Sequence, residues 1–285
     1  MIIRSMERPE LDLVLDWAAK EGWNPGLQDA DAFWAADPDG FIVAERNGQV
    51  VGALSVVSYD ARFGFVGLFI VRPDARKQGV GRALWDDGMK TIRSRLQFEA
   101  SIGLDGVLAM RAAYEKSGFQ YHTRHIRFEG VGVRPTTPIT GVAPAARVPF
   151  ASILAVDSAH FPVPRPRFLA PWLRPNGGAA FAATPRGTMG KLGGYAVVRK
   201  CRNGFKIGPL FAADEASAES LFLSCSAQAA GQPLFLDVPE GNAPAMALAA
   251  KYQMKEVFSC ARMYNGPVPA FNQAGVYGVT TFELG

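Results

Sequence analysis

The pattern of apolar positions divides the first 60 residues into helices and a hairpin. Apolar residues at 11, 14, 15 and 18 recur with the period of one helix face, which predicts a helix from about residue 9 that ends before Gly22. A second, shorter helix is expected over residues 30–36. Two strand-like runs, 41–45 and 50–59, flank Asn47 and Gly48, a pair that favours the positive φ angles of a two-residue hairpin turn.

A nearly continuous apolar run over residues 64–71 is typical of a buried central strand. It leads through a short basic loop that contains glycines into a helix expected over residues 81–96. The next 40 residues predict three further elements: a strand over 101–105, a short helix over 110–116 that ends at Gly118, and one or two strands over 119–133.

The second half of the chain repeats this order of elements. Four prolines in residues 134–150 predict a linker. After it we expect a helix over 151–160, a hairpin around 202–204, a helix with its apolar face at 218–229, a strand over 234–238, a helix over 243–253 and a strand over 257–264. Leu236-Asp237 takes the place of Leu104-Asp105, and we interpret the repeat as a diverged internal duplication. Residues 277–285 alternate like a strand and are expected to pair.

The composition is that of a globular chain and excludes several classes of protein. Of the 285 residues, 48% are hydrophobic and 20% charged, which argues against wholesale disorder. The net charge of +4 is too small to predict nucleic-acid binding by itself. No apolar run reaches the roughly 20 residues of a membrane span, and the first residues lack a signal segment, so we expect a cytoplasmic protein without a membrane. Three cysteines and three histidines lack ligand spacing, and no metal is expected.

The sharpest motif follows the buried strand and precedes the long helix: Arg76-x-x-Gly79-x-Gly81. Glycines let a backbone approach a ligand closely, and the N–H groups at a helix N-terminus attract a phosphate. Arg72, Lys77 and Arg82 add positive charge to the same loop. The motif therefore predicts an anion site, although a tight turn with solvated basic residues is the alternative.

This motif resembles the signature of the GNAT superfamily of acyl-CoA-dependent N-acyltransferases, Arg/Gln-x-x-Gly-x-Gly/Ala at a strand–helix junction. The resemblance implies an α/β (α+β) fold with two tandem GNAT-like domains, each a mixed, mostly antiparallel sheet flanked by helices. We place the catalytic domain at 1–133, the linker at 134–150 and a degenerate GNAT-like domain at 151–285. It also implies that acetyl-CoA or coenzyme A is held by the strand and the loop, through Phe69, Ile70, Val71, Arg76, Lys77, Gln78, Gly79, Val80, Gly81 and Arg82.

The same resemblance assigns chemistry to the short helix. In the family a tyrosine at this place protonates the leaving thiolate, which makes Tyr114 the expected general acid; a packing tyrosine is the alternative. An acidic residue often found on the cofactor strand is missing, since Gly67, Leu68 and Phe69 stand there. Asp105 and Glu21 are the candidate bases, and Asp105 could equally cap the following helix.

The loop over residues 21–26 lies where relatives line the acceptor pocket. Trp23 would give a flat apolar wall, Glu21 could attract an ammonium group, and Asn24 completes the expected substrate contacts; a helix stop with a packing Trp is the alternative. The second half lacks the glycine motif, and Ala249 stands opposite Tyr114, so this half resembles a GNAT domain without catalysis.

The whole chain resembles a tandem-GNAT family of bacterial acetyltransferases, on the stretches 21–26, 206–211, 236–240, 261–264 and 277–285. We therefore predict an acetyl-CoA-dependent N-acetyltransferase in which a primary amine attacks directly. A non-catalytic acyl-CoA sensor or interaction module is the alternative. The expected partner is a small-molecule amine or a protein amine, without nucleic acid, and a homodimer is compatible with the sequence.

Overall fold

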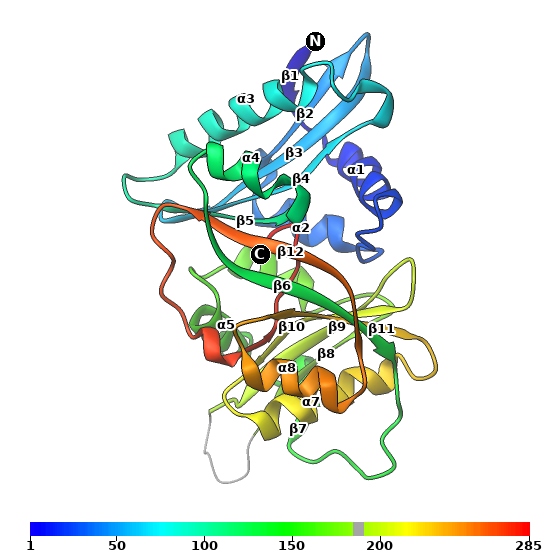
Figure 1. Ribbon diagram of the computed structural model, residues 1–285. Coiled ribbons are helices and arrows are strands. Elements are labelled where there is room, and N and C mark those ends of the chain that lie inside the picture. Colours follow the sequence, from blue (N-terminus) through cyan, green and yellow to red (C-terminus); the bar gives the residue numbers. More distant parts are fainter. Residues whose placement is uncertain (185–190) are drawn as a thin grey trace.

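A computed structural model describes residues 1–184 and 191–285 of the chain. Its strands form a single sheet in the order β1-β2-β3-β4-β5-β12-β6-β11-β10-β9-β8-β7 (Figure 1). A further strand, β13, pairs with β10. Most neighbouring pairs are antiparallel, while β4 pairs with β5 and β10 with β11 in parallel. Helices cover the sheet, which confirms the predicted mixed, mostly antiparallel α/β fold.

The N-terminal half of the chain contains six strands and four α-helices among its described residues. They are β1 (Ile2–Ser5), α1 (Arg8–Lys20), α2 (Asp29–Ala36), β2 (Phe41–Arg46), β3 (Gln49–Asp60), β4 (Phe63–Val71), α3 (Val80–Arg95), β5 (Ser101–Val107), α4 (Arg111–Lys116) and β6 (Gln120–Val131). From α1 onward, each lies close to its predicted range. The last is one unbroken strand, since it is paired along both edges.

The C-terminal half adds seven strands and four α-helices in the described ranges. They are β7 (Val142–Pro144), α5 (Phe150–His160), α6 (Pro166–Trp172), β8 (Ala179–Ala183), β9 (Gly194–Lys200), β10 (Phe205–Ala212), α7 (Glu215–Gln228), β11 (Pro233–Pro239), α8 (Ala243–Lys251), β12 (Lys255–Asn265) and β13 (Val276–Gly278). Three of these elements, β7, α6 and β8, were not predicted. The proline at the end of β7 is tolerated because the strand lies at the sheet edge.

The two halves exchange their long closing strands. In the sheet, β12 of the C-terminal half lies between β5 and β6, and β6 of the N-terminal half lies between β12 and β11 (Figure 1). Each half therefore completes the sheet of the other. The predicted bounds at 133 and 151 divide the chain by sequence, whereas the strands cross that division.

Two buried ion pairs bind the exchanged strands to their hosts. Arg262 on β12 donates two hydrogen bonds to Asp105 on β5, at 2.9 and 2.5 Å, and Arg127 on β6 donates two to Asp237 on β11, both at 2.7 Å. In each case the partners are directly opposed across the sheet. The two Leu-Asp pairs that indicated a duplication thus make equivalent contacts. In each half, the aspartate accepts two hydrogen bonds from an arginine on the exchanged strand.

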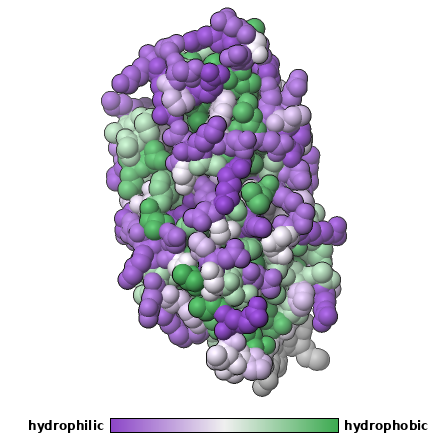
Figure 2. Space-filling model, turned by 90° about the vertical axis from the view of Figure 1, so that its right-hand side faces the viewer, coloured by the Kyte–Doolittle hydropathy of each residue, from purple (hydrophilic) through white to green (hydrophobic). Residues whose placement is uncertain are grey.

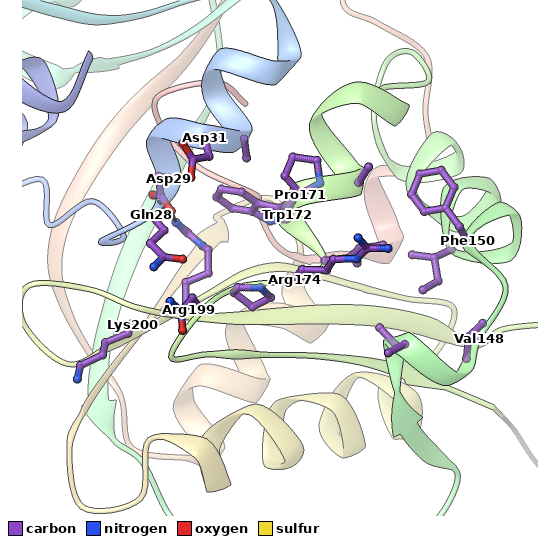
Figure 3. A pocket seen from close by; sticks show the side chains of 18 residues that line it. Gln28, Asp29, Asp31, Val148, Phe150, Pro171, Trp172, Arg174, Arg199 and Lys200 are labelled. Atoms are coloured by element: carbon purple, nitrogen blue, oxygen red, sulfur yellow. Dashed lines mark hydrogen bonds and ion pairs between the residues drawn. The ribbon is translucent and has the colours of Figure 1, made fainter. Parts of the chain in front are cut away.

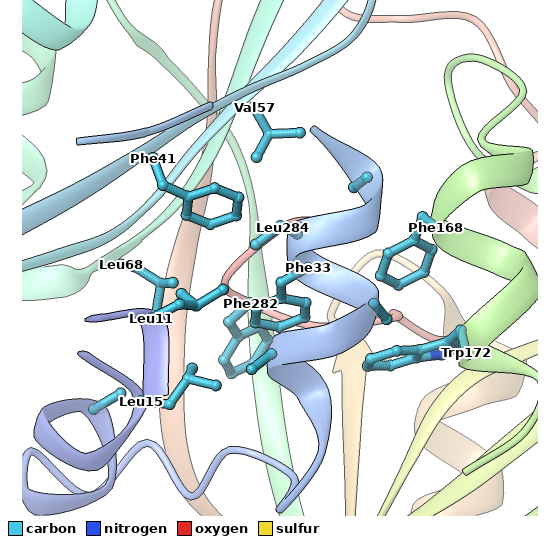
Figure 4. Close-up of a cluster of buried hydrophobic side chains, with 14 of the residues drawn as sticks. Leu11, Leu15, Phe33, Phe41, Val57, Leu68, Phe168, Trp172, Phe282 and Leu284 are labelled. Atoms are coloured by element: carbon cyan, nitrogen blue, oxygen red, sulfur yellow. The ribbon is translucent and has the colours of Figure 1, made fainter. Parts of the chain in front are cut away.

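The core is continuous across the two halves on one face of the sheet. Phe33 on α2 stacks on Trp172 of α6 with 6.1 Å between ring centroids, and the same cluster includes Leu68, Phe168 and Phe282 (Figure 4). The opposite face carries a separate cluster under α3 and α4 and another under α7 and α8. Hydrophilic side chains cover most of the face seen in Figure 2, with apolar ones in small patches.

The C-terminal segment runs back through the middle of the molecule. β13 pairs with β10, and the N–H of Val279 donates to the carbonyl of Asp237 on β11 at 2.8 Å. Of the strand predicted over residues 277–285, only 277 and 278 belong to β13, and residues 279–285 are buried without forming a strand. In the described part of the chain, no helix is both long enough and apolar enough to cross a bilayer.

Candidate active site

Strand β4 parts from β5 in the middle of the N-terminal half. Their parallel pairing ends at Val66 and Leu104. Two residues further along β4, Leu68 has a φ of 45°, and the register against β3 shifts between Gly67 and Ile70. This bulge turns β4 away from β5 and leaves one backbone edge of residues 67–71 unpaired. The predicted cofactor strand therefore borders an opening in the sheet.

The glycine motif forms a cradle of free N–H groups beside this opening. Lys77 and Gly79 have φ angles of 59° and 81°, and Gly79 caps α3. No N–H group of residues 77–82 donates a hydrogen bond to any residue that the structure describes. Six successive unpaired donors at the N-terminus of a 16-residue helix are an arrangement that favours an anion.

The arginines around the cradle form hydrogen bonds and ion pairs within the protein, in addition to making the loop positively charged. Arg76 donates to the carbonyl of Val71 at 2.9 Å and forms an ion pair with Glu21. Arg82 pairs with Asp86 at 2.7 Å on the surface of α3, and Arg72 pairs with Asp74 at 2.6 Å. Among described residues, Lys77 has no such carboxylate partner. Arg76, the arginine of the motif, therefore connects the loop to strand β4.

A cavity of about 490 Å³ occupies the opening between β4 and β5. Its walls come from both halves of the molecule. The N-terminal half supplies Glu21, Trp23, residues 66–71, Arg76, residues 104–107, Met110 and Tyr114, and the C-terminal half supplies Phe258, Cys260, Phe282 and Glu283. A second hollow of about 920 Å³ between α3 and α4 shares Phe69, Met110 and Tyr114 with it. The two spaces therefore meet at Tyr114, below the cradle.

Gly106 on strand β5 leaves room for the ring of Tyr114. The ring packs against Trp85 with 5.3 Å between centroids, and an added Cβ on Gly106 would overlap the same ring. The phenol hydroxyl has no hydrogen-bond partner among the described residues. Burial raises the pKa of Tyr114 to about 12. The phenol is therefore protonated at neutral pH, at the junction of cavity and hollow.

Asp105 lies in the cavity wall, but its carboxylate is paired with Arg262 on the exchanged strand β12. Besides its two bonds from Arg262, its Oδ1 lies 3.0 Å from Nδ1 of His125 on β6. Burial alone would raise the pKa of Asp105, but the charges of Arg262 and His125 outweigh it and lower this pKa to about 2. A carboxylate this acidic is a weak proton acceptor.

The loop after α1 reaches the cavity with two of its three predicted residues. Trp23 lines it, and its carbonyl accepts hydrogen bonds from Arg127 at 2.6 Å and from Lys206 at 3.3 Å. Glu21 lines it while paired with Arg76. Asn24 lies outside the cavity and exchanges two hydrogen bonds with the backbone of Asn203, at 2.9 and 3.1 Å, which fixes the loop to the β9–β10 hairpin.

Sequence reasoning missed the four cavity residues that the C-terminal half supplies. The strand exchange brings Phe258 and Cys260 on β12 against β5, and the returning segment brings Phe282 and Glu283. One signal was available for the last of them. Glu283 is the single charged residue of the closing stretch 277–285, and it is only 4% exposed.

The opening in the C-terminal half is filled by the chain itself. Pairing of β10 with β11 ends at Ile207 and Leu236, and residues 278 and 279 then bond to both strands. Asp214 caps α7 by accepting from the N–H of Ser217 at 2.7 Å. This half therefore offers neither an open strand edge nor a free helix N-terminus at the equivalent place.

A larger cavity of about 790 Å³ lies away from the glycine motif, between α6 and β9 (Figure 3). Arg199 in its wall is directed toward Asp29, with which it forms a buried ion pair, and its guanidinium lies 4.1 Å from the ring centroid of Trp172. No residue of the cradle lines this cavity. Within the described residues, no cluster of His, Cys, Asp and Glu could hold a metal ion.

Comparison with known proteins agrees with this geometry. A model of the acetyltransferase (GNAT) family matches residues 8–119, and a model of an acetyltransferase (GNAT) domain matches residues 153–278. The chain belongs to the GNAT family of acetyltransferases and carries two GNAT domains in tandem.

Individual relatives extend over different parts of the chain. A holothin acyltransferase from Pseudoalteromonas sp. is 28% identical over 97% of this chain and 92% of its own length. A mycothiol acetyltransferase from Streptomyces coelicolor is 32% identical over 32% of this chain and 30% of its own.

Two solved structures share the fold. A putative acetyltransferase from Pyrococcus horikoshii covers all of this chain and 95% of its own, with a TM-score of 0.83 and 23% identity. A tandem GNAT protein from the clavulanic acid biosynthesis pathway covers 94% of this chain and 99% of its own, with a TM-score of 0.62 and 17% identity.

Proposed function

We propose that this protein is an acetyl-CoA-dependent N-acetyltransferase whose N-terminal domain, residues 1–133, binds the cofactor and carries the chemistry. The observation that carries the proposal is the row of six unpaired N–H groups at the head of α3, next to the open edge of β4. Relatives named holothin acyltransferase and mycothiol acetyltransferase support acyl transfer.

The residues present fit coenzyme A. The N–H groups of residues 77–82 suit a pyrophosphate, and the free edge of residues 69–71 suits the amide groups of a pantetheine arm. When bound, acetyl-CoA supplies an activated acetyl thioester. Residues 134–150 would then act as the linker and residues 151–285 as a domain without a cofactor of its own, because the C-terminal segment fills its equivalent opening.

Tyr114 is the proposed acid of the reaction. With a pKa of about 12, its phenol keeps its proton at neutral pH and can donate a hydrogen bond to the thioester sulfur. Because burial also makes the phenol a weaker acid, we propose that this hydrogen bond strengthens as charge builds on sulfur. The proton then moves only as the thiolate leaves.

The acceptor is proposed to be a primary amine on a small molecule. The cavity is walled by Trp23, Phe258 and Phe282 from three separate segments, which suits a compact apolar body better than an extended peptide. Holding the amine beside the thioester in this enclosed space would supply much of the rate gain.

Substitution of Tyr114 by Phe tests the proposal. It removes one hydroxyl from the cavity and leaves the packing against Trp85 unchanged. We expect acetyl transfer to a panel of primary amines, measured by thiol release, to fall about 100-fold, while the calorimetric Kd for coenzyme A stays within about threefold. A protein that binds coenzyme A but transfers to no amine, with or without the hydroxyl, would instead be an acyl-CoA sensor.

A further inference from the structure

The closing segment of the chain passes through both openings of the sheet. The carbonyl oxygen of Thr280 lies against Gly208 on β10, and that of Glu283 lies against Gly67 on β4. An added Cβ at either glycine would overlap the segment. Each glycine stands one residue beyond the last parallel pair of its half. Both halves therefore have a glycine at the equivalent position, and the glycine on β4 leaves room for the backbone of Glu283.

Several contacts fix this segment in place. Tyr59 donates to the carbonyl of Leu284 at 2.9 Å, and Arg165 donates to Oγ1 of Thr280 at 2.7 Å. Phe282 packs with its ring centroid 4.8 Å from the guanidinium of Arg127, and its aromatic ring belongs to the shared core (Figure 4). Glu283 is thus held between the buried neighbours Phe282 and Leu284.

Glu283 differs from the other carboxylates of the cavity. Asp105 is paired with Arg262 and His125, and Glu21 is paired with Arg76. The Glu283 side chain is buried, lines the cavity and forms no hydrogen bond or ion pair with any described residue.

The cationic groups near Glu283 form their hydrogen bonds with other partners, although Nε and Nη2 of Arg199 have none among the described residues. Arg127 pairs with Asp237, Arg199 pairs with Asp29, and the ammonium of Lys206 donates to the carbonyl of Trp23. Cys260 on β12 is the nearby thiol, and burial raises its pKa well above the usual range, so it stays neutral at pH 7. The Glu283 carboxylate is therefore available to a cationic ligand in the cavity.

We propose that Glu283 receives the ammonium group of the acceptor and takes its proton, and that the acceptor is a primary amine next to a flat aromatic or similarly planar body. This inference rests on the proposed function. Trp23, Phe258 and Phe282 supply the planar walls. A buried carboxylate without a partner is stabilised when a cation binds beside it, and the two then form a charge-assisted hydrogen bond.

The proton balance of this step is simple. The ammonium gives up one proton to solvent through Glu283, and its second proton moves to Glu283 as the N–C bond forms. The C–S bond breaks, and the sulfur takes the phenol proton of Tyr114. Transfer of one proton from Glu283 to Tyr114 through solvent restores both residues, so the net products are the amide, the free thiol and one proton.

Glu283→Gln tests this role, with phenethylamine as the acceptor probe and acetyl-CoA as donor. We expect kcat/KM for phenethylamine to fall at least 100-fold at pH 7.5. In calorimetry, the affinity of phenethylamine for the coenzyme A complex should fall at least tenfold, while the Kd for coenzyme A stays within threefold. Glu283→Asp should recover part of both losses, and Glu99→Gln on the surface should change neither.

Gly67→Ala provides a second variant that keeps the charge. The new methyl group would displace Glu283, so the same loss of amine binding with intact coenzyme A binding is expected. The proposal is overturned if Glu283→Gln keeps amine binding and kcat/KM within threefold, or if coenzyme A binding falls as much as amine binding. If the wild-type protein does not bind phenethylamine, the proposal that the acceptor is an amine next to a planar body is overturned. Binding without transfer would instead count against the acetyltransferase function and leave Glu283 as the ammonium receptor.

Discussion

At the scale of single residues, the site depends on absent side chains as much as on reactive ones. Gly106 leaves the space in which the Tyr114 ring lies, and Gly67 leaves the space for the Glu283 backbone. Neither glycine has a left-handed backbone, so the reason for each is close approach and not conformation. The reactive groups are thus placed by neighbours that carry no chemistry.

Gly106→Ala should therefore impair catalysis without touching the cofactor loop. The methyl group forces the Tyr114 ring to shift, which moves the phenol away from its position between cavity and hollow. We expect kcat/KM with acetyl-CoA to fall at least tenfold, about 1.4 kcal/mol of transition-state stabilisation, with an unchanged Kd for coenzyme A. Gly241→Ala, where an added Cβ would meet only one side-chain atom at 3.8 Å, is the control and should leave both values unchanged.

At the scale of elements, the strand–loop–helix unit works because its backbone groups are left unpaired. The bulge at Leu68 frees the edge of β4, and the left-handed Gly79 is the N-cap of α3, where the first N–H groups have no partner among the described residues. The arginine of the motif is engaged with the strand and with Glu21. Backbone geometry thus carries more of this anion site than side-chain charge does.

Gly79→Ala should weaken cofactor binding through strain alone. Its φ is 81°, and no atom lies within 4 Å of an added Cβ, so the substitution costs about 1 kcal/mol in backbone conformation and nothing in packing. If the loop relaxes to relieve that strain, calorimetry should show a five- to tenfold weaker Kd for coenzyme A. Gly48→Ala in the β2–β3 hairpin has φ 73° and equally open space, so it should lower stability similarly with an unchanged Kd.

At the scale of the whole molecule, the exchange of β6 and β12 makes one folding unit of two sequence repeats. The buried Arg262–Asp105 and Arg127–Asp237 pairs lie on the two exchanged strands, and α2 packs on α6 across the shared core. The exchange also brings Phe258 and Cys260 into the cavity. The cavity proposed as the active site is therefore complete only when both halves are folded together.

This coupling predicts a specific loss of stability in acid. The pKa of Asp105 is about 2 in the folded protein against an ordinary value of 3.8, so its contribution of about 2 kcal/mol is present above pH 4 and is lost as the pH falls toward 2. Urea unfolding at pH 7, 4 and 3 should show this fall in the wild-type protein. Asp105→Asn should flatten it and lower stability at pH 7 by roughly 3–5 kcal/mol, because Arg262 loses its partner. Asp86→Asn, which breaks only an exposed pair, should change little.

The sequence by itself determined the local elements, the duplication and the place of the glycine motif between strand and helix. Helical and strand periods, the Asn47-Gly48 turn and the motif at residues 76–81 depend on neighbours within a few positions, and such neighbours can be read along the chain. Trp23 and Tyr114, which the resemblance to the GNAT superfamily singled out, both line the cavity.

Only the tertiary structure decided which residues close the cavity. Asp105 was a candidate base until Arg262, 157 positions away, was found bonded to it, and Asn24 proved to bond to Asn203 across 179 positions. Glu283 meets Gly67 because the closing segment threads between strands that pair through long-range contacts. Pairing partners at such separations leave no periodic pattern in the sequence, so the strand exchange and the carboxylate it delivers appear only in the folded chain.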